Sequence, residues 1–116
     1  MLQEERNKID KIDKQIVKLL EERMEVAAEI AKIKKENNME IFNSSREKIV
    51  IEKVKSYLEN ENLEEYLEKV YLNLMDISKD YQKDIIEKLK WNSITIILFK
   101  SKTVNSNLSL PFIIFY

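Results

Sequence analysis

Apolar residues recur along the first third of the chain at the spacing of one face of a helix. At about 100° per residue, the following residues fall within roughly 40° of one direction on a helical wheel: Ile9, Ile12, Ile16, Leu20, Ala27 and Ile30. This unbroken pattern predicts a first helix from about Leu2 to Lys35, with a length of about 50 Å. Such a helix is longer than a compact domain of about 100 residues is wide, so we expect a second copy of the chain to cover part of it.

Two further helices follow a polar connector at residues 36–43. Ser44 begins the second, and Glu47 three residues later gives the spacing of a capping box. Its apolar side comprises Ile49, Val50, Val54, Tyr57 and Leu58. Asn62 and Glu65 repeat the cap and acid pattern before a third helix. The apolar face of that helix comprises Leu67, Tyr71, Leu74, Met75, Tyr81, Ile85 and Leu89. Because the chain has no glycine and its single proline is Pro111, residues 1–90 are predicted to form an all-α domain with a long, a short and a long helix.

The composition changes at about Trp91. Residues 93–99 and 112–116 are apolar and rich in β-formers, and Lys, Ser and Asn residues separate them. We therefore expect helical periodicity to stop there, and residues 91–116 to form an atypical, non-essential C-terminal tail or the remnant of a truncated fusion. The alternative is a short hairpin packed on the helices, with edges prone to aggregation if they are unpaired.

Polar side chains occupy positions on these helices where a core would be expected. Arg23 and Lys34 lie in the apolar stripe of the first helix, and that face carries no carboxylate within a turn of either except at its margin. An unpaired buried charge costs several kcal/mol, so the expected partner is an anion from outside the chain. Ser78 and Gln82 lie on the apolar face of the third helix, and Arg46 lies beside that of the second. The five side chains are therefore predicted to converge on one interior.

Each of these residues taken alone has an ordinary explanation. Arg23 could extend its charged end to solvent, Lys34 could interact with helix-terminal carbonyls, and Ser78 could bond to the preceding turn. Gln82 could form a polar layer that sets helix register. If there were no binding site here, all of these explanations would have to hold at once. The pattern therefore favours a binding site.

The spacing of the two central cations favours a small dianion as the ligand. Arg23 and Lys34 are about three turns, or roughly 16 Å, apart along the helix, which leaves room for a molecule with negative groups at separate points. Arg6 lies about 80° from the centre of the stripe on the N-terminal arm, where it could reach over a neighbouring subunit in a dimer.

The composition excludes several classes of chemistry. Twenty basic and 21 acidic residues nearly cancel and form no basic block, which argues against nucleic acid or a membrane surface as the partner. The absence of histidine and cysteine excludes Ser/His/Asp and Cys/His catalysis and thiolate metal sites, and no residue indicates a metal or organic cofactor. The charged N-terminus has no apolar segment of a signal peptide, so we expect a cytoplasmic protein.

Five segments together resemble the all-helical chorismate mutases: residues 6–13, 19–24, 27–34, 46–47 and 76–82. The order of these segments and their separations match those of the family across about residues 2–86. The resemblance implies an intertwined homodimer with two active sites, each inside one subunit's helices and completed by an arginine of the other. It also implies the isomerisation of chorismate to prephenate, the committed step of phenylalanine and tyrosine biosynthesis in the shikimate pathway.

The resemblance also implies which residues carry this activity. Arg23 and the partner's Arg6 would bind the two carboxylates of the substrate. Lys34 and Gln82 would hydrogen-bond the ether oxygen of the breaking bond.

The same resemblance assigns residues around the second helix. Arg46 and Ser78 would complete the carboxylate shell, and Glu47 would hold the ring hydroxyl. Asn43 stands where the family usually has an aspartate; the change is mild if the contact is made by the backbone, and weakens hydroxyl recognition if the carboxylate is needed.

The chemistry of this rearrangement suits the composition. It is intramolecular and moves no proton, so it needs positioning and a fixed cation rather than an imidazole or a thiol. Two alternatives stay open: an isochorismate pyruvate-lyase on the same scaffold, and a non-catalytic helical module, either a regulatory partner or the remaining domain of a bifunctional enzyme.

Overall fold

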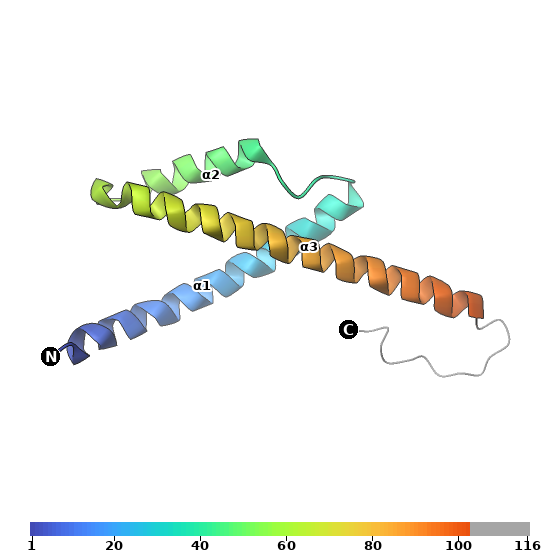
Figure 1. The fold of residues 1–116 in the computed structure, drawn as a ribbon, viewed down its shortest axis with the longest axis horizontal. Helices are drawn as coiled ribbons and strands as arrows, with labels where there is room; N and C mark the ends of the chain where they lie inside the picture. The colour runs from blue at the N-terminus through green and yellow to red at the C-terminus, as the bar shows by residue number, and fades with distance from the viewer. Residues whose placement is uncertain (103–116) are drawn as a thin grey trace.

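The described part of the chain folds into three α-helices and one short 3₁₀ helix. The computed structural model describes residues 1–102, with side chains described for 1–100. Helix α1 spans Gln3–Glu36, α2 spans Ser44–Ser56 and α3 spans Glu64–Lys102, with the short 3₁₀ helix η1 at Glu61–Leu63 before α3 (Figure 1). No strand occurs in this part of the chain, which confirms the predicted all-α, three-helix fold.

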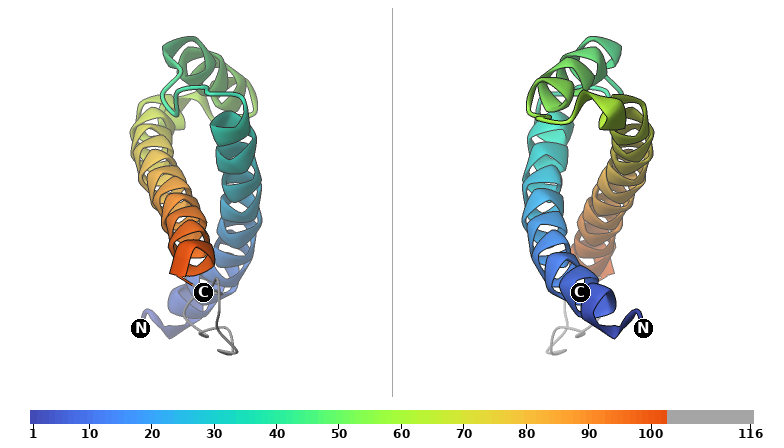
Figure 2. Two further views of the ribbon diagram at one scale, coloured as in Figure 1. Left: turned by 90° about the vertical axis from the view of Figure 1, so that its right-hand side faces the viewer. Right: turned by 90° about the vertical axis from the view of Figure 1, so that its left-hand side faces the viewer.

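Helix α3 organises the molecule because both other helices pack against it. In Figure 1, α1 and α3 cross each other near the middle of the molecule, and α2 runs beside the first half of α3. Figure 2 shows α1 and α3 as two arms with α2 across one end. Three segments distant in sequence therefore meet at the end of the molecule that α2 covers.

The ends of α1 fall within one residue of the prediction. Glu4 and Glu5 lie in its first turn and Lys34 and Lys35 in its last, as the helix dipole favours. The helix ends at Glu36 with Asn37 as its C-cap, and the next residue, Asn38, adopts the left-handed conformation with φ 54°, where asparagine is better tolerated than most residues.

The predicted cap of α2 is wrong by one residue. Asn43, in an extended conformation, is the N-cap, and its side-chain oxygen accepts a hydrogen bond from the backbone N–H of Arg46 at 3.0 Å. Asparagine and serine are equally good N-caps. Because Asn43 takes this position, Ser44 is the first residue of the helix, and Glu47 does not form a capping box with it. Asn60 likewise replaces the predicted Asn62 as the cap before α3, and accepts from the Asn62 N–H at 3.1 Å.

The prediction that helical structure stops at about residue 91 is wrong for residues 91–102, which continue α3. The predicted first strand of the hairpin, residues 93–99, is therefore helical, and its second strand, residues 112–116, lies outside the described residues. β-Branched residues disfavour a helix by only a few tenths of a kcal/mol each, and no glycine or proline interrupts propagation here. Asn92, Thr95 and Phe99 are half-buried at helical spacing.

The chain buries a small core. Its buried apolar side chains between residues 1 and 100 are Ala27, Ala31, Ile51, Val54 and Met75. The radius of gyration is 20.8 Å, against about 13 Å for a compact chain of this length. Most of the apolar stripe of α1 therefore lies outside this chain's own core; Ile9, for example, is 56% exposed.

None of the helices, as far as residues are described, contains an apolar stretch long enough to cross a bilayer.

Candidate functional site

A cavity of about 660 Å³ lies between the three helices and the connector from α1 to α2. Seven of the eight predicted site residues line it: Arg23, Lys34, Asn43, Arg46, Glu47, Ser78 and Gln82. The eighth, Arg6, lies on the exposed N-terminal arm of α1 and does not line this cavity. The structure therefore brings together residues from all three helices that the sequence separates by up to 59 positions.

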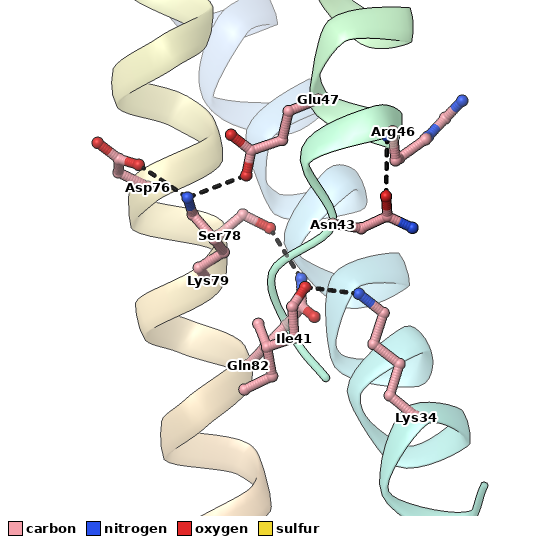
Figure 3. Close-up of polar contacts among 9 residues, drawn as sticks. All are labelled: Lys34, Ile41, Asn43, Arg46, Glu47, Asp76, Ser78, Lys79 and Gln82. Carbon is pink, nitrogen blue, oxygen red and sulfur yellow. Dashed lines mark hydrogen bonds and ion pairs between the residues drawn. The ribbon is translucent and has the colours of Figure 1, made fainter. Parts of the chain in front are cut away.

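Lys34 lines the cavity and is held by the connector. Its Nζ donates a hydrogen bond to the backbone carbonyl of Ile41 at 2.7 Å (Figure 3). An ammonium group has three N–H donors, so this contact orients the group and leaves two donors for a ligand. None of the ion pairs within residues 1–100 includes Lys34, and its charge is not neutralised by the described chain.

Arg23, three turns earlier on α1, is half-buried and also lacks a carboxylate partner among residues 1–100. Its guanidinium carbon lies 6.0 Å from the centroid of the Tyr71 ring on α3. This is the outer limit of a cation–π contact, so the ring positions the guanidinium without cancelling its charge. Arg23 and Lys34 therefore both present positive charge to one cavity.

Ser78 and Gln82 form the α3 wall of the cavity and are buried, with 6% and 7% exposure. Gln82 Nε2 donates to Ser78 Oγ at 3.3 Å, and Gln82 Oε1 has no partner among the described residues. An unpaired buried polar atom costs about 1–3 kcal/mol. If the amide is rotated by 180°, the Ser78 hydroxyl donates to Oε1 and an N–H₂ donor takes the unpaired position. In either state the Gln82 amide has hydrogen-bonding capacity that the protein does not use.

Glu47 reaches from α2 to Lys79 on α3. Lys79 Nζ lies 2.9 Å from Glu47 Oε2 and 3.1 Å from Asp76 Oδ1, and its ammonium lies 4.8 Å from the centroid of the Phe42 ring (Figure 3 shows the two ion pairs). The hydrogen bonds to Glu47 and then to Asp76 raise the pKa of Lys79 above its ordinary value of 10.5, so it is charged at neutral pH.

The sequence interpretation did not include Lys79. It lies about 40° from Met75 on a helical wheel, close enough to the apolar face of α3 to have been a candidate.

Asn43 and Arg46 lie where the connector enters α2. The Asn43 side-chain oxygen is engaged by the Arg46 N–H, so its role in this structure is that of a helix cap. The Arg46 side chain is exposed and, in Figure 3, extends away from Ser78 and Gln82, which places its guanidinium at the rim.

The charged groups that line the cavity favour a dianion. Four cationic side chains, Arg23, Lys34, Arg46 and Lys79, face two carboxylates, Glu22 and Glu47, which leaves a formal excess of two positive charges. A lining of one predominant sign attracts a ligand of the opposite sign. No group of three carboxylates among the described residues is arranged to hold a metal ion.

The fold is that of a helical protein, and the charges that line its cavity are those expected of a binding site for a small anion. The chain belongs to the chorismate mutase family: residues 5–83 match the family model described as chorismate mutase type II. The resemblance seen in the sequence is thereby confirmed.

Curated relatives agree with this assignment. The chain is 33% identical over 88 residues to the chorismate mutase of Methanocaldococcus jannaschii, which covers 75% of this chain and 89% of the relative. It is 37% identical over 84 residues to the bifunctional chorismate mutase/prephenate dehydratase of Buchnera aphidicola subsp. Acyrthosiphon pisum, and 34% identical to that of subsp. Schizaphis graminum. These matches cover 72% of this chain and 22% of each bifunctional relative. No solved structure gives a significant match.

Proposed function

We propose that the cavity binds chorismate and isomerises it to prephenate by a Claisen rearrangement. The observation that carries this proposal is the pair Arg23 and Lys34, two cations that face one cavity with no carboxylate partner within residues 1–100. Chorismate is a dicarboxylate, and its two negative charges equal the formal positive excess of the lining.

The proposed catalysis depends on positioning and fixed charge. Arg23 binds a carboxylate and so holds the flexible enolpyruvyl ether in its reactive conformation. As the C–O bond breaks, negative charge develops on the ether oxygen, and Lys34 and Gln82 donate hydrogen bonds to it. The Ile41 carbonyl fixes the direction of the Lys34 ammonium before the substrate arrives, so little reorganisation is needed in the transition state.

The remaining lining residues would orient the substrate. Ser78 and Arg46 complete the carboxylate shell, and Glu47 accepts a hydrogen bond from the ring hydroxyl. Asn43 acts through the backbone, because its side-chain oxygen is occupied as the cap of α2.

We further propose that the enzyme is a homodimer in which Arg6 completes the partner subunit's site. Support comes from the exposed apolar stripe on the N-terminal half of α1 and from the extended shape of a single chain. Arg6 lies on this exposed N-terminal half of α1 and does not line the cavity of its own chain. The expectation of a cytoplasmic location stays a prediction.

The direct test is to follow the loss of chorismate absorbance in the presence of the purified full chain. Sedimentation of the same protein measures the mass of the active species. We expect turnover to prephenate by a species of twice the chain mass. Isochorismate supplied in a parallel assay tests the lyase alternative, since release of pyruvate from it would overturn the mutase proposal if chorismate is unchanged. A protein that transforms neither substrate would instead be the non-catalytic helical module.

A further inference from the structure

Lys79 connects the three parts of the chain that close one side of the cavity. From α3 it contacts Glu47 on α2 through Oε2, Asp76 on its own helix through Oδ1, and the ring of Phe42 in the connector. Lys79 and Glu47 both line the cavity, and their side chains are 22% and 24% exposed. The function proposed above includes the Lys79 charge in the net charge of the lining but gives the residue no contact with the substrate.

We propose that Lys79 is a positioning residue for Glu47. Its ion pair holds Glu47 Oε2, so that Oε1 is left to accept a hydrogen bond from the substrate hydroxyl. The ammonium also offsets a carboxylate charge that would otherwise repel the dianionic substrate. The inference rests on the proposed function, because it concerns the same cavity and the same substrate.

The two carboxylates around Lys79 have different surroundings. The Asp76 side chain is 69% exposed, so solvent screens its ion pair with Lys79, which spans a single helical turn. The Glu47 pair is half-buried, shorter and formed between helices, and it faces the ligand cavity. Asp76 therefore restrains the ammonium from the solvent side, and the pair with Glu47 is the one that affects binding.

Phe42 adds a third restraint. Its ring lies 4.8 Å from the Lys79 ammonium, a favourable cation–π distance. Because the ring covers the ammonium, it limits the positions that Lys79 can take. The Glu47 carboxylate is thus held from α3 and, indirectly, from the connector.

The chain contains a matched control in Lys55. This residue also ties α2 to α3, through Glu64 at 3.8 Å and Glu68 at 3.4 Å, and its side chain is 23% exposed. It does not line the cavity of about 660 Å³. Replacing Lys55 therefore removes an equivalent link between the helices without changing the environment of Glu47.

The test compares steady-state kinetics for Lys79→Met, Lys79→Arg and Lys55→Met with those of the wild type, with folding checked by circular dichroism. We expect Lys79→Met to raise KM for chorismate about tenfold with kcat changed less than about threefold, because Glu47 is then no longer held in place for the bound ground state and its charge is no longer offset. Lys79→Arg keeps the charge and donors and should restore most of the affinity. Lys55→Met should leave both constants within about twofold.

A double-mutant cycle with Glu47→Gln shows whether Lys79 acts through Glu47. We expect Lys79→Met to raise KM less than about threefold when Glu47 is already Gln, since the charge that it offsets is gone. Equal kinetics for Lys79→Met and Lys55→Met, or effects of Lys79→Met and Glu47→Gln that simply multiply, would overturn the inference. An inactive wild type would instead contradict the proposed function.

Discussion

The ammonium of Lys34 donates to the backbone carbonyl of Ile41 at 2.7 Å, and this contact joins the end of α1 to the connector that leads into α2. It serves two purposes. It stops the connector from moving away from the cavity, and it directs the remaining N–H donors of Lys34 towards a ligand.

Replacing Lys34 by alanine should abolish measurable turnover. Loss of a fixed donor to a developing oxyanion typically costs about 3–4 kcal/mol, or two to three powers of ten in rate. The measurement is kcat for chorismate, with circular dichroism and sedimentation to show that the helical dimer persists. Lys32→Ala, an exposed site on the same helix, is the control and should be unaffected. Near-normal turnover of Lys34→Ala would remove the proposed mechanism.

Replacing Gln82 by glutamate should make the enzyme active only at acidic pH. The new carboxyl can donate a hydrogen bond to the ether oxygen when it is protonated, and repels developing negative charge when it is ionised. Activity should therefore rise as pH falls, whereas the wild-type amide does not titrate. The profile of kcat/KM against pH for the two proteins checks this, and a flat profile for Gln82→Glu would contradict the role given to Gln82.

Mixing two inactive variants should restore activity if Arg6 acts across a dimer interface. Arg6→Ala and Lys34→Ala subunits that are unfolded and refolded together pair at random, so half of the dimers are mixed and each has one complete site. We expect about a quarter of wild-type activity from the equimolar mixture. Each variant refolded alone is the control, and Lys8→Ala controls for loss of a nearby exposed cation. No recovery would place Arg6 outside the partner's site.

Asn43 should tolerate aspartate better than alanine. Asn43→Ala loses the cap of α2 and should destabilise the protein by about 1 kcal/mol, measured from the urea midpoint. Asn43→Asp keeps an acceptor for the Arg46 N–H and adds a negative charge at a helix N-terminus, so stability and turnover should stay close to the wild type. A large loss of kcat/KM in Asn43→Asp would instead indicate that the amide contacts the substrate.

We propose that the functional domain ends at about residue 90. No side chain between residues 83 and 100 is buried, and Trp91 and Ile97 are 67% and 64% exposed, so removing this end of α3 uncovers no core of a single chain. A chain that ends after residue 90 should keep its turnover, and one that ends after residue 102 serves as the comparison. Loss of activity in the shorter chain alone would show that residues 91–102 belong to the domain.

The sequence was sufficient for those features that depend on periodicity. The apolar stripe set the limits of α1 to within one residue, and the polar exceptions in it, Arg23 and Lys34, identified two lining residues of the cavity. Helical spacing alone also placed Ser78 and Gln82 on the inner face of α3. The resemblance to the family supplied the candidates that a wheel does not single out, Asn43 and Glu47.

Other features depended on contacts between segments. Whether Asn43 or Ser44 caps α2 is decided by one hydrogen bond, because both residue types are good caps. The partner of Glu47 is a lysine 32 positions away, and only the packing of α2 on α3 brings them to 2.9 Å. The β-propensity of residues 93–99 predicts the wrong structure, because residues 91–102 contain no helix-breaking residue and α3 continues through them.

Taken alone, the sequence determined the helical class and which side chains break its apolar faces, because both follow from residue type at a regular spacing along one chain. The tertiary structure decided which charges stay unpaired. Arg23 and Lys34 have no carboxylate partner among residues 1–100, whereas Lys79 is paired with Glu47 and Asp76, since pairing depends on the distances between helices and not on their order in sequence.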